Sequence, residues 1–210
     1  MNIIKSLEWR YATKKFDDTK HLTNNQIDIL KNAFNLTATS YGLQPVKLVV
    51  VKNKEIQQQL VAHSWNQQQV AQASHVLVIC IQENLSSEDI ENYFKLVKEI
   101  RNTPDEILNP FKDFLKSSIS TKSEIEIFEW MKNQAYIALG NLLNVAAAER
   151  IDTCPMEGFS PEKYDEVLDL KKHNLKSTLV LPVGFRAEDD YMKDLKKVRK
   201  NLKDVVIEIN

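Results

Sequence analysis

The stretch from Ser123 to Phe159 constrains the fold more than any other part of the chain. Its second half, Ala135 to Ala148, is apolar on nearly every side, whereas an amphipathic surface helix would show a regular polar face. The run is too short to span a bilayer, so it predicts a helix buried inside protein. A helix from Ser123 to Arg150 would be roughly 40 Å long at about 1.5 Å per residue, more than one small domain usually needs to cover its core.

Small residues along this helix leave room for a second helix to approach closely; they are Ala135, Ala138, Gly140 and Ala146 to Ala148. Two interpretations fit the pattern: a central core helix of a monomer, and a helix buried partly against a second subunit. In either case the chain continues into the segment from Cys154 to Phe159. There Pro155 and Gly158 predict a turn that exposes backbone N–H groups.

Composition narrows the class of protein. The 210 residues are 43% hydrophobic and 27% charged, which is ordinary for a globular chain and predicts a single domain, residues 1–210. The formal net charge of −1 gives no reason to expect nucleic acid or an anionic membrane as a partner. We find no signal-peptide or transmembrane pattern, and two cysteines fit a reducing cytoplasm.

Apolar runs predict strands at 46–51, 75–81 and 177–185, with Pro182 marking an interruption or an end. Apart from Lys47, the first is expected to be buried on both faces or nearly so, and the second to be central in a sheet sandwiched by helices. Helices are expected after the N-cap Thr23, at 55–65, at 66–73 and after Ser160. Two more, at 86–101 and 105–117, form a helical excursion in which Phe111, Phe114 and Leu115 are most simply core; a mobile lid over a pocket is the alternative. The apolar segment 205–209 predicts a strand that pairs far from its sequence neighbours.

Familiar catalytic motifs are absent from the sequence. There is no GxGxxG or GxxxxGK[ST] motif, no Ser-His-Asp arrangement and no metal-ligand spacing among the four histidines, and His75 is best read as structural. Difficult chemistry would therefore have to come from a cofactor. The basic segment from Arg10 to Lys14 is either a solvated turn or an anion-binding segment.

Several short segments occur in a fixed order along the chain: RYATKKFD, TATSYGLQPVKLVVV, NQQQVAQASHVLVICI, EWMKNQAYIALGNLLNVAAAERIDTCPMEGF, LVLPVGFR and KKVRK. Together they resemble the oxygen-insensitive, FMN-dependent NAD(P)H nitroreductases, a group that includes dihydropteridine reductase-like enzymes. The similarity covers essentially the whole chain. Its strongest parts are the R-x-x-T-K-x-F start, the S-x-x-x-Q-P loop and the P-x-E-G-F turn.

The resemblance implies an α+β fold with a central mixed β-sheet flanked by helices. It also implies a homodimer built on the long core helix, with FMN at the interface and a C-terminal strand exchanged to the partner subunit. The implied activity is a ping-pong oxidoreductase, in which a hydride from NADH or NADPH passes through bound FMN to a nitroaromatic, quinone or pterin-like acceptor. No side chain acts as the catalyst in such a reaction, and the flavin N5 does the chemistry with Lys14 and Glu157 in support.

The resemblance also implies site residues. The phosphate and ribityl chain of FMN would be held by Arg10, Ala12, Lys197 and Arg199, and Lys14 would lie near the pyrimidine side of the ring. Asn66 would read the ring edge, and the turn Pro155, Met156, Glu157, Gly158 would place N–H groups near N5. Thr39, Ser40 and Gln134 would come from the other subunit. The complete expected cofactor set adds Tyr11, Gln44 and Gln69, and the expected acceptor side comprises Tyr41, Phe111 and Phe114.

Two positions depart from the resemblance. Ala12 stands where the family often has Ser, and Gln69 stands where relatives often carry Lys toward the flavin and nicotinamide. Both affect the expected flavin affinity and reduction potential. Alternatives at this stage are a flavin-binding carrier or sensor without efficient turnover, a same-fold flavoenzyme with another substrate, and a purely structural helical dimer. The sequence does not identify the acceptor or the preferred nicotinamide.

Overall fold

The computed structural model describes residues 2–209. They form eight α-helices and one four-stranded sheet, which confirms the expected α+β class. The strands are β1 (Val46–Val51), β2 (His75–Gln82), β3 (Asp152–Thr153) and β4 (Leu175–Gly184), in the order β1-β2-β4-β3. All three strand pairs are antiparallel. One chain therefore forms an antiparallel sheet rather than the expected mixed sheet. A parallel contact occurs in the isolated bridge between Ala12 and Thr153.

β2 is the central strand, as its apolar run predicted. Its residues His75 to Ile81 are buried because β1 and β4 pair with its two edges and helices cover both faces. β1, apart from Lys47, was also expected to be buried on both faces or nearly so, and that prediction was wrong for Leu48 to Val50. Lys47 is exposed and the three residues after it are only half-buried, since β1 lies at the edge of the sheet.

Pro182 lies inside β4 and does not end it. Its carbonyl accepts a hydrogen bond from the Cys154 backbone N–H at 3.1 Å. In an antiparallel strand the nitrogen of a residue faces the same side as its carbonyl, so the missing N–H faces the segment after the two-residue strand β3. The ladder to β2 loses no donor at this position, which is why the proline is tolerated there.

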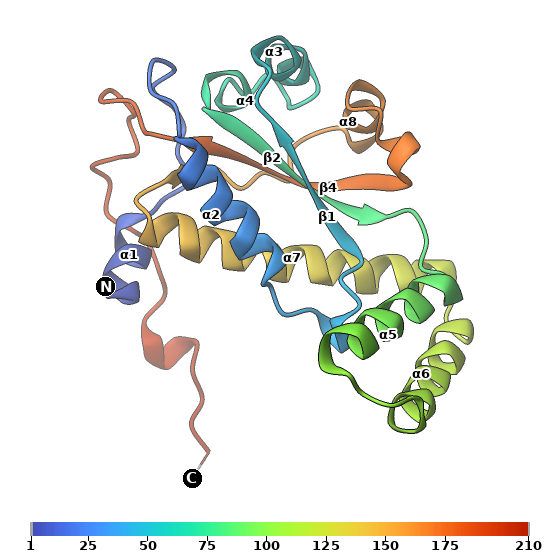
Figure 1. Ribbon diagram of the computed structural model, residues 1–210. Helices are drawn as coiled ribbons and strands as arrows, with labels where there is room; N and C mark the ends of the chain where they lie inside the picture. The colour runs from blue at the N-terminus through green and yellow to red at the C-terminus, as the bar shows by residue number, and fades with distance from the viewer. Residues whose placement is uncertain (1, 210) are drawn as a thin grey trace.

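Helices cover the two faces of the sheet (Figure 1). On one face, α2 (Asn24–Asn35) and α7 (Glu124–Ala148) pack against Leu77, Ile79 and Leu181. On the other, α3 (Lys54–Ala62), α4 (Gln69–Gln72) and α8 (Pro161–Val167) pack against Val76 and Val78. Alternate residues of β2 thus fill two separate cores, as the period of a strand requires.

α7 is the long helix that the sequence predicted. It runs for 25 residues and begins with a capping box between Ser123 and Glu126. One side is fully buried, but Ile137 is 50% exposed and Tyr136 and Gly140 are also exposed. We call these three residues the open stripe of α7. Within residues 2–209 no helix combines the length and apolarity that crossing a membrane requires.

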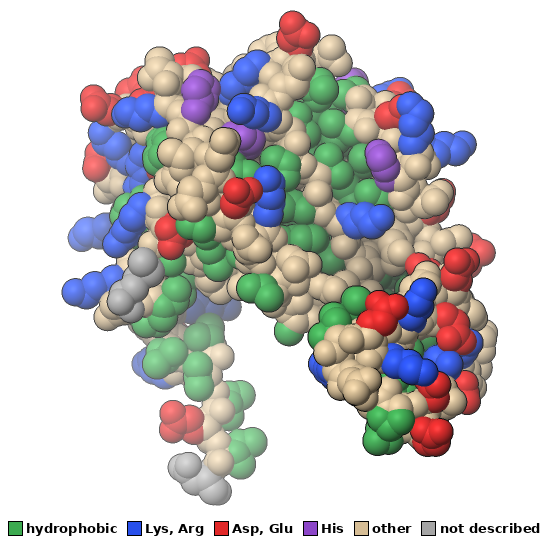
Figure 2. Space-filling view, viewed as in Figure 1, with side chains coloured by type: hydrophobic (Ala, Val, Ile, Leu, Met, Phe, Trp, Pro, Cys, Tyr) green, Lys and Arg blue, Asp and Glu red, His purple; other side chains and the backbone are tan. Residues whose placement is uncertain are grey.

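The helical excursion is present as α5 (Ser87–Arg101) and α6 (Asp105–Ser120), which project from the sheet (Figures 1 and 2). The two helices share a small core of Ile90, Phe94, Leu108 and Leu115. Phe111 and Phe114 were expected in the core, but they are 44% and 56% exposed. Phe111 meets the Phe94 ring of α5 only edge-on, at 5.9 Å between ring centroids, and both side chains stay largely open, so that expectation was wrong for them.

Two other predicted elements end differently. The helix expected at 55–65 stops at Ala62, because Trp65 and Asn66 adopt positive φ values of 53° and 59°. The short helix expected at 66–73 shrinks to α4. The N-terminal helix α1 spans Ile3–Trp9 and is capped by the Asn2 side chain.

The C-terminal segment does not form a strand within this chain. After a short 3₁₀ turn at Leu202–Asp204, residues 205–209 pair with no strand of the described chain and are exposed. Figure 1 shows this tail running away from the sheet, and Ile207 and Ile209 are 89% and 94% exposed. The predicted strand therefore has no partner inside the monomer.

Candidate functional site

The segment that follows α1 is fixed beside β3. The Thr13 N–H donates to the Thr153 carbonyl at 3.1 Å, and Phe16 bridges to Arg186 just after β4. These contacts hold residues 10–16 in an extended course along the sheet edge. Arg10, Ala12 and Lys14 are therefore presented from a defined backbone rather than from a mobile turn.

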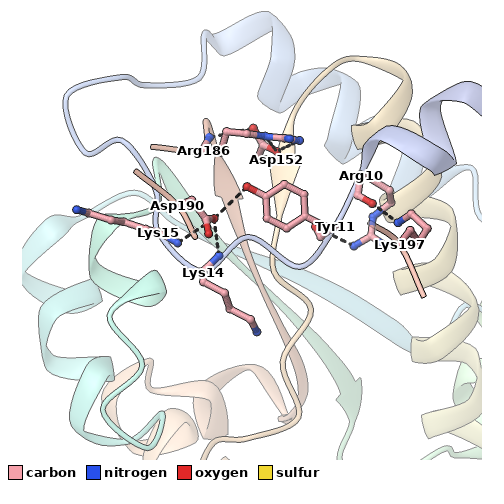
Figure 3. Close-up of polar contacts among 8 residues, drawn as sticks. All are labelled: Arg10, Tyr11, Lys14, Lys15, Asp152, Arg186, Asp190 and Lys197. Atoms are coloured by element: carbon pink, nitrogen blue, oxygen red, sulfur yellow. Dashed lines mark hydrogen bonds and ion pairs between the residues drawn. The ribbon is translucent and has the colours of Figure 1, made fainter. Parts of the chain in front are cut away.

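Arg10, Lys197 and Arg199 form a group of positive charges that we call the cation cluster. Lys197 Nζ donates to the Arg10 carbonyl, which brings the C-terminal segment against α1 (Figure 3). Burial and the Arg199 charge hold the pKa of Arg10 below its ordinary value. Burial and the charges of Arg10 and Arg199 likewise lower the pKa of Lys197. The three side chains are thus close enough to repel one another.

The cation cluster has no acidic counterpart in the structure. Among residues 2–209, none of its three members forms an ion pair with a carboxylate. Arg10 Nη2 donates to the Tyr11 carbonyl at 3.2 Å, but Arg10 Nε is buried without a partner. An anion bound here would satisfy that donor and relieve the repulsion among the charges. This arrangement favours the anion-binding interpretation of the basic segment.

Lys14 directs its side chain away from the backbone contact that fixes it. Its N–H donates to Asp190 Oδ2 at 2.9 Å, while the side chain extends in another direction (Figure 3). Burial raises the pKa of the Cys154 thiol, and the charges of Lys14 and Arg10 oppose that rise. Lys14 and Arg10 therefore both lie near Cys154, at the start of the P-x-E-G-F turn.

The turn itself is held on two sides. The Met156 N–H donates to the Val180 carbonyl at 2.8 Å, so this amide is already used and is not available to a ligand. The expectation of exposed N–H groups is therefore wrong for Met156. Glu157 Oε1 accepts a hydrogen bond from Tyr136 of α7 at 2.6 Å. That contact joins the turn to the open stripe.

Gly158 is required by a close approach. A Cβ at this position would lie 2.7 Å from the Trp65 ring, and Gln67 Nε2 donates to the Gly158 carbonyl at 3.1 Å. The segment carrying Asn66 and Gln69 therefore lies against the turn. Gln69 is buried, and Asn66 is exposed with its backbone in the left-handed region. The structure thus brings Lys14, the turn and the 65–69 segment together.

A second group of expected residues gathers elsewhere along α7. The Ser40 N–H donates to Gln134 Oε1 at 2.8 Å, and the Gln44 N–H donates to Thr39 Oγ1 at 3.2 Å. The 39–44 loop and α1 lie toward opposite ends of α7 (Figure 1). One chain therefore does not bring Thr39, Ser40 and Gln44 to the cation cluster.

The expected acceptor residues form one aromatic group. The Tyr41 ring lies 6.2 Å from Phe111 and 6.4 Å from Trp130, and Phe111 stacks with Phe114 at 6.3 Å. Tyr41 adopts a positive φ of 59°, which turns its side chain toward the excursion helices. Trp130 was not anticipated as a member of this group. Its position one turn before Gln134 on α7 is the only sequence signal that links it to the loop.

The model of the Nitroreductase family matches residues 7–185, which is most of the chain. The chain belongs to the nitroreductase family. The membership predicted from the ordered motifs is thereby confirmed.

Relatives of this nitroreductase-family chain align over almost its whole length. A Staphylococcus epidermidis protein, provisionally named an NAD(P)H nitroreductase, is 32% identical over 97% of this chain and 95% of its own length. A Bacillus subtilis protein with the same provisional name is 29% identical over 97% and 96%. A crystal structure from Exiguobacterium sibiricum, described as a nitroreductase in complex with FMN, superposes with a TM-score of 0.87. It is 17% identical and covers 100% of this chain and 98% of its own.

Sequence analysis of this nitroreductase-family chain missed the buried charges that support the site. Asp152 is 4% exposed and pairs with Arg186, whose guanidinium lies 4.3 Å from the centre of the Trp9 ring. Asp190 is 1% exposed and accepts hydrogen bonds from the 11–15 segment. Both acids stand in charged sequence that reads as solvated surface, so no local signal distinguishes them.

Proposed function

We propose that the chain is an FMN-dependent oxidoreductase that takes a hydride from NADH or NADPH and reduces a nitroaromatic, quinone or pterin-like acceptor by a ping-pong mechanism. One observation carries the proposal: an unpaired cation cluster lies beside the P-x-E-G-F turn in a chain of the nitroreductase family. The names of the relatives and the FMN complex of a structural neighbour support the nicotinamide and the flavin.

The residues present fit FMN. Arg10, Lys197 and Arg199 would hold the phosphate, because guanidinium and ammonium donors without a carboxylate partner match its charge and oxygen geometry, and the buried Arg10 Nε has no partner of its own. Backbone groups of Tyr11 and Ala12 would contact the ribityl chain. Asn66, Gln69 and the turn from Pro155 to Gly158 would lie along the ring, with the amides of Glu157 and Gly158 as its donors in place of that of Met156.

FMN, when bound, would accept the hydride and pass the electrons to the acceptor. The chain would contribute binding, orientation and charge rather than an acid or base. Lys14 would supply positive charge next to the ring, where reduction builds up negative charge. Gln69 is neutral where relatives often have Lys, so the reduced flavin would be less stabilised here. Ala12 offers no hydroxyl to the phosphate.

A second copy of the chain would complete the site. The open stripe of α7 leaves Tyr136, Ile137 and Gly140 uncovered, and the apolar tail at 205–209 has no partner strand in its own chain. In a homodimer the two stripes would pack together and the tail would pair with the partner subunit. Thr39, Ser40, Gln44 and Gln134 would then reach the flavin of the other subunit, and Tyr41, Phe111 and Phe114 would line the acceptor side. The two buried, free cysteines suit a reducing cytoplasm.

The test is an absorption spectrum of the purified protein, followed by anaerobic addition of NADH or NADPH. We expect oxidised-flavin bands that bleach on addition and recover when an acceptor is supplied. Bands that do not bleach with either nucleotide would favour a flavin carrier or sensor. Colourless protein that does not bind added FMN would favour the interpretation of the chain as a purely structural helical dimer. Acceptor profiling then separates nitroreductase activity from a same-fold enzyme with another substrate.

The residue assignment has its own test. Arg199→Ala removes a charge from the cation cluster, and Lys14→Ala removes the charge beside the turn. We expect both variants to lower FMN occupancy. Lys14→Ala should in addition slow the reduction of the bound flavin by NAD(P)H. Full occupancy in both variants would refute the assignment.

A further inference from the structure

Asp190 joins the two segments that carry the cation cluster. Its Oδ2 accepts hydrogen bonds from the Lys14 N–H at 2.9 Å, the Lys15 N–H at 3.2 Å and the Tyr11 hydroxyl at 3.0 Å. Its Oδ1 accepts from the Met192 N–H at 2.9 Å. Figure 3 shows the carboxylate enclosed by the 11–15 backbone and the Tyr11 ring. Both carboxylate oxygens are therefore engaged, one toward each segment.

The C-terminal segment needs such an anchor. Residues 187–201, all described, form no helix or strand, so no ladder of backbone hydrogen bonds fixes Lys197 and Arg199. The Ala187 N–H bonds to the Lys15 carbonyl at 3.0 Å, and beyond Asp190 the contact back to the N-terminal segment is Lys197 Nζ on the Arg10 carbonyl. Asp190 lies between these two contacts.

The positive charges of the cation cluster make this attachment more necessary. Burial and the Arg199 charge lower the pKa of Arg10, and burial with the charges of Arg10 and Arg199 lowers the pKa of Lys197, so like charges oppose the approach of the two segments. Four donors surround a carboxylate that is only 1% exposed. Burial alone would raise the pKa of Asp190, but the donating N–H groups hold it below its usual value, so the group is charged near neutral pH.

We propose that Asp190 is a positioning residue, which holds the Arg10 segment and the Lys197–Arg199 segment at the spacing that a phosphate monoester requires. It makes the site selective for FMN over riboflavin without touching either flavin. The inference rests on the proposed function, since the phosphate is the ligand that the cation cluster would bind.

The test compares FMN with riboflavin, which differs only by the phosphate, on the full-length chain. Asp190→Asn keeps the size of the side chain but has one acceptor oxygen, so its amide N–H₂ must face either Met192 or the 11–15 segment. We expect the Kd for FMN to rise by about tenfold or more, the size of losing hydrogen bonds to a charged group, while the Kd for riboflavin, which lacks the phosphate, rises much less. The ratio of the riboflavin Kd to the FMN Kd would fall accordingly.

Asp165→Asn is the matched control, because Asp165 Oδ1 likewise accepts a backbone N–H, that of Ser177 at 2.8 Å, but in a contact between α8 and β4. It should leave both Kd values unchanged. Tyr11→Phe removes only one donor to Asp190 and should lower the ratio in the same direction by a smaller factor. Tyr11→Phe is the variant to measure if Asp190→Asn does not fold.

The outcomes separate the two proposals. A parallel loss of FMN and riboflavin binding, or no loss of either, would overturn the positioning role and leave the proposed function intact. Wild-type protein that binds neither flavin would overturn the proposed function itself, and the role of Asp190 with it. A selective loss of FMN binding supports both.

Discussion

At the scale of single residues, burial decides which charges can form. His75 opens β2 with its side chain 6% exposed, and its Nδ1 lies 2.9 Å from the Ser74 hydroxyl. Burial, followed by the charges of Lys52 and Lys54, lowers the pKa of His75 to about 4. The folded protein therefore keeps this imidazole neutral under conditions where an unfolded chain would protonate it.

This predicts acid sensitivity. The unfolded chain binds a proton near the ordinary pKa of about 6.5 and the folded chain only near 4, so the free energy of unfolding should fall as the pH drops between these values. The expected loss from His75 alone between about pH 7 and about pH 5 is ~2 kcal/mol. Urea unfolding of wild type and His75→Gln at the two pH values measures it, because the variant should lose that part of the pH dependence.

His173→Gln provides the control, since His173 is exposed on the segment before β4. Its pH dependence should match that of wild type. Equal pH dependence in wild type and His75→Gln would mean that other groups account for the acid sensitivity.

At the scale of elements, the two serine caps differ although their sequences look alike. Ser123 Oγ accepts from the Glu126 N–H at 3.3 Å, and Glu126 Oε2 accepts in return from the Ser123 N–H at 2.8 Å. Ser160 begins α8 but makes no side-chain hydrogen bond to the helix backbone. The sequence predicts an N-cap at Ser160, whereas the structure gives the hydrogen-bonded cap to Ser123 at the start of the longer helix.

Ser123→Ala should therefore destabilise the protein by about 1 kcal/mol, because one free N–H at the start of α7 loses its partner. Ser160→Ala should change the free energy of unfolding by less than about 0.5 kcal/mol. Chemical denaturation of both variants at one pH measures the difference. Equal losses would contradict the assignment of the α7 cap.

At the scale of the whole molecule, the single chain leaves apolar surface uncovered in two places. The open stripe exposes Ile137 at 50%, and a Cβ on Gly140 would meet nothing within 4 Å. The tail at 205–209 is also exposed. Our proposal of a homodimer accounts for both surfaces at once.

Ile137→Glu should then convert the dimer to a monomer and lower its FMN occupancy, because a carboxylate without a partner is costly to bury at an interface. Light scattering coupled to size exclusion, together with the flavin absorbance, measures both effects. Ile100→Glu on α5 changes a residue that is 74% exposed and should leave both unchanged. A dimeric, flavin-loaded Ile137→Glu protein would place the interface elsewhere.

The sequence by itself determined the central strand β2, the long helix α7, the helical excursion and membership of the nitroreductase family. These features depend on local periodicity, on capping residues and on ordered motifs, all of which can be read along the chain. The cationic residues Arg10, Lys197 and Arg199 were also identified from their motifs.

Only the tertiary structure decided what depends on neighbours distant in sequence. It placed β1 at an open edge, kept Pro182 inside β4, exposed Phe111 and left the tail without a strand. It also showed that Asp190 is buried, although the charged run around it resembles surface. Burial and hydrogen bonding are properties of pairs of segments brought together by folding, so a local pattern of residue types does not contain them.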